Sequence, residues 1–213
     1  MAPDTASRPF LWGVATSAYQ AEGGYNGPGQ PETNWAACER RGRVMPLGRA
    51  ADFWNRYRED FATCRALGLN AFRLGIEWSR VQPSGRCARP LPAPDGPPFD
   101  DAALEAYADR IAAARAHELE PVVTLHHFVH PAWLGPDPWL TPSVLPRFET
   151  YVGRTVERVN RALVERHGTA PIGHYITINE PNMLVLNTYF GNQFPGAAPR
   201  GLRTVVRAYD TLL

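Results

Sequence analysis

Polar side chains with acid/base or hydrogen-bonding chemistry stand at the end of each of four apolar segments of the chain. They are Gln20 and Glu22 after the first segment, Arg73 and Glu77 at the second, His126 and His127 at the third, and Asn179 and Glu180 after the fourth. Amides, imidazoles and carboxylates bond to hydroxyls, and aromatic rings cover apolar C–H faces, so this set suits a polyol such as a sugar. A carboxylic acid in the position of Glu180 is also a candidate general acid.

Three histidines within five residues, His126, His127 and His130, suggest a different chemistry, because imidazoles are common zinc ligands. Neighbouring side chains on a strand point to opposite faces, so His126 and His127 cannot both reach one ion without distortion. No carboxylate follows them at ligand spacing. We therefore expect no metal and no other cofactor, and a metal-dependent hydrolase is the least favoured alternative.

The elements that must position these residues alternate regularly along the chain. Apolar segments near residues 10–18, 71–81, 121–128 and 174–179 have the length and composition of strands. Helical periodicity follows them at about residues 51–67, from Asp100 or Asp101, from Leu145 to about Gly168, and from Leu202. The loop at residues 23–48 is far longer than most strand-to-helix connections, which is typical of functional loops.

This alternation predicts an α/β fold of four β/α units around a parallel sheet. A (β/α)₈ TIM barrel needs eight units and about 250 residues or more, so residues 1–213 are expected to form a single partial domain, the N-terminal half of such a barrel. In barrels of this kind the active site lies at the C-terminal ends of the strands. All four groups of polar residues named above fall there.

Composition excludes several classes of function. Twenty-two Lys+Arg against 21 Asp+Glu give a formal net charge of +1, which predicts binding neither to nucleic acid nor to an anionic membrane. Every basic residue is Arg, so Schiff-base lysine chemistry and a P-loop lysine are excluded within this chain. The three cysteines, Cys38, Cys64 and Cys87, encode neither a disulfide framework nor a zinc site. With no signal-peptide pattern, the expected location is cytoplasmic.

Four motifs make the interpretation more specific. They are residues 10–23, which include Trp12-Gly13, Tyr19-Gln20 and Glu22-Gly23; residues 70–80, which include Phe72-Arg73 and Glu77-Trp78-Ser79-Arg80; Thr124-Leu125-His126-His127-Phe128; and Thr177-Ile178-Asn179-Glu180-Pro181. In this order they resemble the signatures of glycoside hydrolase family 1, the β-glucosidase family. The last resembles that family's T-x-N-E-P acid/base motif. Many members have Tyr-His-Trp where this chain has His126-His127-Phe128, so the aromatic wall of the sugar site differs.

The resemblance implies a role for five residues. Glu180 would be the catalytic acid/base. Gln20 and His127 would bond hydroxyls of the sugar being cleaved, and Asn179 would contact its 2-hydroxyl. Arg73 would stand beside the catalytic nucleophile and keep it ionised, because an opposite charge favours a carboxylate.

The implied function is that of a retaining β-glycosidase that hydrolyses O-glycosidic bonds of β-glycosides or oligosaccharides. Such an enzyme needs two carboxyl groups about 5 to 5.5 Å apart, and the family's second carboxylate, in a late E-N-G motif, has no counterpart in this sequence. The expected partner is a complementary C-terminal half-barrel or a second copy of the chain, and the chain alone is expected to be inactive. The alternative is a catalytically inactive half-barrel or sugar-binding module.

Overall fold

The computed structural model describes residues 10–83 and 96–212, and within them four parallel strands form one sheet in the order β1-β2-β3-β4. The strands are β1 (Gly13–Ala15), β2 (Ala71–Gly75), β3 (Glu120–His126) and β4 (His174–Ile178). Each strand pairs in parallel with the next one along the chain. The predicted α/β fold with four β/α units is therefore confirmed.

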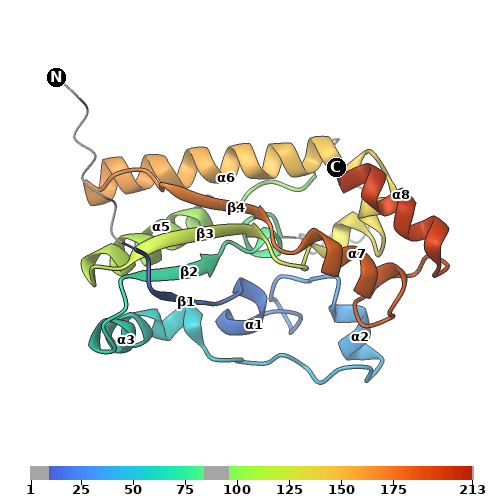
Figure 1. Cartoon of the computed structure of the whole chain (residues 1–213), viewed down its shortest axis with the longest axis horizontal. Coiled ribbons are helices and arrows are strands. Elements are labelled where there is room, and N and C mark those ends of the chain that lie inside the picture. The colour runs from blue at the N-terminus through green and yellow to red at the C-terminus, as the bar shows by residue number, and fades with distance from the viewer. Residues whose placement is uncertain (1–9, 84–95, 213) are drawn as a thin grey trace.

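Helices connect the strands, and the three longest of the described helices cover one side of the sheet (Figure 1). The α-helices are α1 (Ala18–Glu22), α2 (Ala36–Arg40), α3 (Phe53–Ala66), α4 (Trp78–Val81), α5 (Asp101–Ala116), α6 (Val144–His167), α7 (Pro181–Tyr189) and α8 (Leu202–Leu212), and the 3₁₀ turns are η1 (Ala132–Leu134) and η2 (Pro138–Leu140). Helix α5 packs against both α3 and α6. Local signals explain several helix ends: the Asp100 carboxylate caps α5 by accepting from the Ala103 N–H at 3.0 Å, and Gly168 ends α6 at a φ of 62°.

The main core lies between the sheet and the helices α3, α5 and α6. Phe53 of α3 stacks on Phe72 of β2 with ring centroids 5.6 Å apart, and Phe61 meets Phe72 edge-on at 4.9 Å. Trp78 stacks on Tyr151 of α6 at 4.7 Å. The opposite side of the sheet is more open: all three residues of β1 are exposed, and those of β4 are half-buried or exposed.

Two strands are shorter than the sequence suggests. The strand expected near 71–81 ends at Gly75, and the short helix α4 begins at Trp78 because the Glu77 side chain accepts from the Ser79 N–H at 3.3 Å and so caps a helical turn. The strand expected near 10–18 spans only Gly13–Ala15, since α1 begins at Ala18. The strands expected near 121–128 and 174–179 form as β3 and β4, ending at His126 and Ile178.

Two further features of the sequence have a place in the fold. Cys38 and Cys64 are buried free thiols, whereas Cys87 lies outside the described residues. Among the helices of residues 10–83 and 96–212, none is long and apolar enough to cross a membrane.

Candidate functional site

Arg73 is at the centre of the polar residues at the C-terminal end of the sheet. From β2, its Nε donates to Thr124 Oγ1 of β3 at 2.7 Å, and its Nη2 donates to Asn179 Oδ1 after β4 at 2.6 Å. Nη2 also lies 3.5 Å from His127 Nδ1. One guanidinium therefore joins three neighbouring strands, which the parallel register places side by side.

These contacts orient the side chains that Arg73 touches. Because a guanidinium only donates, Arg73 holds the carbonyl oxygen of the Asn179 amide and leaves its NH₂ group available to another acceptor. Likewise, the Nδ1 of His127 faces the guanidinium as an acceptor, so the ring proton lies on Nε2. Burial and then the positive charge of Arg73 lower the pKa of His127 to about 4. His127 is thus a neutral N–H donor at pH 7.

Glu180 follows Asn179 directly and begins the turn into α7. The Asn179 N–H continues the sheet by donating to the His126 carbonyl at 2.9 Å, but Glu180 leaves the strand with a φ of 40°. This left-handed conformation is unusual for a residue with a Cβ, and more so before a proline such as Pro181. The Glu180 side chain is exposed. Its negative charge acts to raise the pKa of Arg73, against the lowering that burial causes.

The structure does not join Gln20 to this group. Gln20 lies in α1, just beyond β1, and its side chain is exposed. Its Oε1 accepts from the Ser17 hydroxyl at 2.8 Å. Of the five residues named from the sequence, Arg73, His127 and Asn179 are in contact, Glu180 follows them in the chain, and Gln20 stands apart on the neighbouring strand end.

A row of aromatic rings, which the sequence analysis did not identify, begins at His127. The His127 ring lies 4.9 Å from Phe128, Phe128 lies 5.0 Å from Phe194, and Phe194 meets Trp35 edge-on at 5.7 Å. Phe128 has a φ of 68°, which turns the chain sharply after β3. Phe194 comes from the loop between α7 and α8, and nothing in the local sequence marks it as a neighbour of Phe128.

The other two histidines of the cluster contact different residues from those that His127 contacts. His126 is buried, with its ring edge-on to Trp139 at 5.1 Å, and His130 Nε2 lies 3.0 Å from the Gly135 carbonyl oxygen. Burial lowers the pKa of His126 to about 3 and that of His130 to about 4. Within the described parts of the chain, no three His, Cys, Asp or Glu residues are grouped to hold a metal ion.

The two other carboxylates at strand ends, Glu22 and Glu77, accept hydrogen bonds from side chains inside the protein. Glu22 accepts from the Tyr107 hydroxyl at 2.8 Å, from the Tyr25 hydroxyl, and from Arg80 at 3.0 Å. Glu77 accepts from the Ser79 hydroxyl at 3.0 Å, and burial, followed by the charge of Glu22, raises the pKa of Glu77 to about 8. Both carboxylates are buried, so of the acids named from the sequence only Glu180 is open to a ligand.

The sequence of the chain is similar to a family profile and to individual glycosidases over most of its length. Residues 3–212 match the sequence profile of Glycosyl hydrolase family 1. Over 192 residues the chain is 36% identical to a 6-phospho-beta-galactosidase of Lacticaseibacillus rhamnosus, covering 89% of this chain and 36% of that protein. It is also 33% identical, over an alignment of 192 residues, to a coniferin beta-glucosidase of Pinus contorta, covering 87% of this chain and 34% of that protein. The chain therefore spans about a third of the length of these curated relatives.

Solved structures match over almost the whole chain. The fold superimposes on a beta-glycosidase from Pyrococcus horikoshii with a TM-score of 0.75 and 27% identity, covering 95% of this chain and 42% of that one. The four β/α units thus correspond to part of a larger barrel.

Proposed function

The chain belongs to glycosyl hydrolase family 1, and from this membership we propose that it carries the acid/base half of a retaining β-glycosidase site. Glu180 is the proposed acid/base, and Gln20, His127 and Asn179 are the proposed ligands of the sugar hydroxyls. Arg73 is proposed to keep the nucleophilic carboxylate ionised. A complementary C-terminal half-barrel would supply that carboxylate.

The observation that carries the proposal is the 2.6 Å hydrogen bond from Arg73 Nη2 to Asn179 Oδ1. It holds a donor NH₂ group and a cation side by side at the strand ends, one residue before an exposed carboxyl group at Glu180. A sugar hydroxyl oxygen can accept from the Asn179 NH₂ and from the Nε2–H of His127. Such an arrangement supports binding of a polyol next to an acid.

The proposed chemistry has two steps. In the first, the external carboxylate attacks the anomeric carbon while Glu180 gives its proton to the leaving glycosidic oxygen, so the C–O bond breaks and a glycosyl-enzyme forms. In the second, Glu180 takes a proton from water, the water attacks the anomeric carbon, and the nucleophile leaves as a carboxylate. The substrate is an O-linked β-glycoside or oligosaccharide.

The first test compares the chain alone with a completed barrel. The 213 residues alone should not release nitrophenol from 4-nitrophenyl β-glucoside or its 6-phospho-β-galactoside counterpart. A fusion to a C-terminal half that bears the nucleophile should cleave at least one of them with retention of configuration. Sugar binding without any turnover by the fusion would instead support the non-catalytic sugar-binding module.

The second test concerns Glu180 in that active fusion. Glu180→Gln removes the proton donor with little change of shape, so substrates with poor leaving groups should lose about 10²- to 10⁴-fold in rate. Azide, which needs no general base, should restore turnover of activated aryl glycosides and yield a β-glycosyl azide. Glu149→Gln, an exposed carboxylate on α6, is the matched control. An unchanged leaving-group dependence in Glu180→Gln would overturn the assignment of Glu180.

A further inference from the structure

Two arginines from distant loops share one neutral acceptor close to Phe194, one of the rings of the aromatic row. Arg43 follows α2, and its Nη2 donates to Asn192 Oδ1 at 3.0 Å. Arg200, just before α8, donates from its Nη2 to the same Oδ1. Two guanidiniums that share one acceptor are held within roughly 6 Å of each other.

The charges of this pair are not balanced by a carboxylate. Among the ion pairs of residues 10–83 and 96–212, none includes Arg43 or Arg200. Two arginines near Arg43 in the chain do have carboxylate partners, since Arg40 pairs with Glu32 and Arg49 pairs with Asp52. Both Arg43 and Arg200 are exposed. Two like charges therefore converge on an amide that neutralises neither of them, which an anion would relieve.

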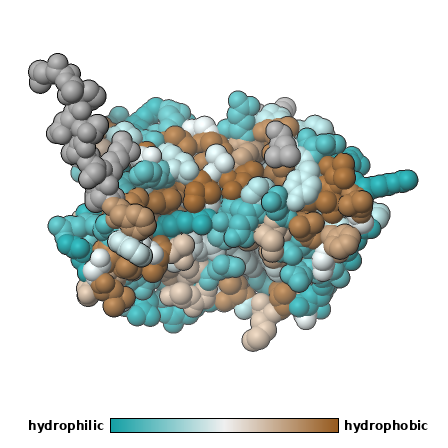
Figure 2. Space-filling model, in the orientation of Figure 1, coloured by the Kyte–Doolittle hydropathy of each residue, from teal (hydrophilic) through white to brown (hydrophobic). Residues whose placement is uncertain are grey.

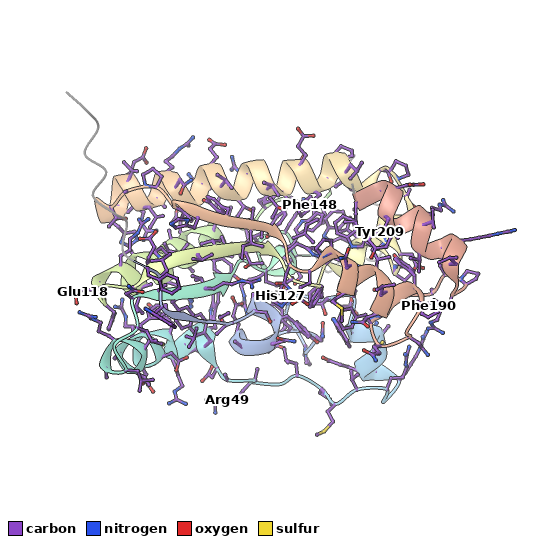
Figure 3. The ribbon with its side chains drawn as sticks, in the orientation of Figure 1. Arg49, Glu118, His127, Phe148, Phe190 and Tyr209 are labelled. Carbon is purple, nitrogen blue, oxygen red and sulfur yellow. The ribbon has the colours of Figure 1, made fainter. Side chains whose placement is uncertain are left out.

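The pair lies beside the row of rings that starts at His127. Asn192 is two residues before Phe194, a separation of at most about 7 Å along the chain, and Phe194 contacts both Phe128 and Trp35. The loop begins at Phe190, which Figure 3 places at the opposite end of the molecule from Glu118. Asn192 itself has a φ of 55°, so the loop turns sharply where the two arginines meet.

We propose that Arg43 and Arg200 form a subsite for an anionic group, a carboxylate or a phosphate, on the aglycone of the substrate. This inference rests on the proposed glycosidase function, in which the sugar lies at His127 and Asn179 and the aglycone extends outward along Phe128 and Phe194. Two guanidiniums match the two oxygens of such an anion, which displaces the amide of Asn192 as their acceptor. The chain then selects acidic aryl β-glycosides over neutral ones.

Binding to the 213-residue chain tests the subsite directly. Saturation-transfer NMR titrations would compare phenyl β-glucoside with its 4-carboxy and 4-phosphono derivatives. We expect both anionic derivatives to bind at least about tenfold more tightly, as is typical of hydrogen bonds to charged groups, and the preference to weaken with added salt. The larger of the two preferences identifies the anion. Equal affinity of all three glycosides, or binding of none, would overturn the proposal.

Three variants test whether the preference for anionic glycosides depends on Arg43 and Arg200. Arg43→Gln/Arg200→Gln should abolish the preference, whereas Arg65→Gln, which removes an exposed arginine paired with Glu118, should retain it. Asn192→Asp keeps both arginines and the shape of the loop but supplies an internal carboxylate, so it should also abolish the preference. Far-UV circular dichroism and thermal melting check that each variant is folded. A preference retained in the double variant or in Asn192→Asp would contradict the proposal.

A sugar-free probe separates this inference from the proposed function. If 4-hydroxybenzoate binds with the same dependence on Arg43 and Arg200 while the sugar adds no affinity, the anion subsite stands and the glycoside function fails. If the sugar adds affinity but the carboxylate does not, the glycoside function stands and the anion subsite fails.

Discussion

Arg73 orients the two side chains that it contacts and adds to the lowering of the His127 pKa. Its guanidinium holds Asn179 Oδ1 at 2.6 Å and faces His127 Nδ1 at 3.5 Å, so both partners present donors to a ligand. Burial and the charge of Arg73 lower the pKa of His127 from 6.5 to about 4. His127 therefore binds a proton less readily in the folded chain than in the unfolded chain, so its neutral form stabilises the fold above about pH 6.5. This stabilisation is lost as the pH falls from about 6.5 to about 4.

Removing the charge of Arg73 should raise the pKa of His127. In Arg73→Gln we expect the titration midpoint of the His127 Hε1 resonance, followed by NMR, to move upward from about 4 but to stay below 6.5, because burial is the larger cause of the shift. Arg65→Gln, which removes an exposed arginine of α3 that pairs with Glu118, is the control and should leave the midpoint unchanged. A midpoint that does not move in Arg73→Gln would show that the two side chains are not coupled.

At the scale of secondary-structure elements, one buried ion pair and its hydrogen-bond partner link the helices α1, α4 and α5. Arg80 of α4 pairs with Glu22 of α1 at 3.0 Å, with their side chains 12% and 1% exposed. The guanidinium also lies over the rings of Trp54 and Tyr25 at 3.8 and 4.4 Å. Tyr107 of α5 completes the group by donating to Glu22 at 2.8 Å. Removing either charge leaves the other buried without compensation.

Arg80→Met should therefore lower the free energy of unfolding by about 3 to 5 kcal/mol. Glu22→Gln/Arg80→Met should cost much less than the sum of the two single variants, because neither charge is then left alone. Arg56→Met breaks the exposed pair with Glu59 and should change the free energy of unfolding far less than Arg80→Met does. Urea denaturation measures all four variants. A cost for Arg80→Met no larger than that of Arg56→Met would mean that the buried pair does not stabilise these helices.

At the scale of the whole molecule, the sheet of the described residues has two open edges, β1 and β4. Large apolar side chains are exposed beside β1, with Phe10 71% and Trp12 66% accessible. Figure 2 shows brown, hydrophobic surface along the open side of the sheet and at the end formed by α7 and α8. Unpaired strand edges with apolar neighbours favour association with another chain.

The 213-residue chain is accordingly expected to self-associate or to bind a complementary half-barrel. Light scattering after gel filtration should show species larger than a monomer at micromolar concentration. Val14→Lys places a charge on the open edge of β1 and should reduce the association, whereas Leu67→Lys, which changes an exposed apolar residue after α3, should not. A monodisperse monomer that melts cooperatively would contradict this expectation.

The sequence by itself determined the features that depend on near neighbours. Alternating apolar segments and helical periodicity predict four β/α units, and the run from Thr177 to Pro181 places Asn179 beside Glu180 at a strand end. Local caps also explain where α5 begins and α6 ends. These features follow from residues a few positions apart, whose spacing is fixed by the geometry of helix and strand.

Only the tertiary structure decided which polar residues meet and which are buried. Glu22, Glu77 and Glu180 look alike in the sequence, yet two are buried in hydrogen-bonded networks and one is exposed. The contact between Arg73 and Asn179 joins residues 106 positions apart, and that between Phe128 and Phe194 joins two loops. Such contacts depend on strand register and loop path, which arise from packing the whole chain and leave no local periodicity to read.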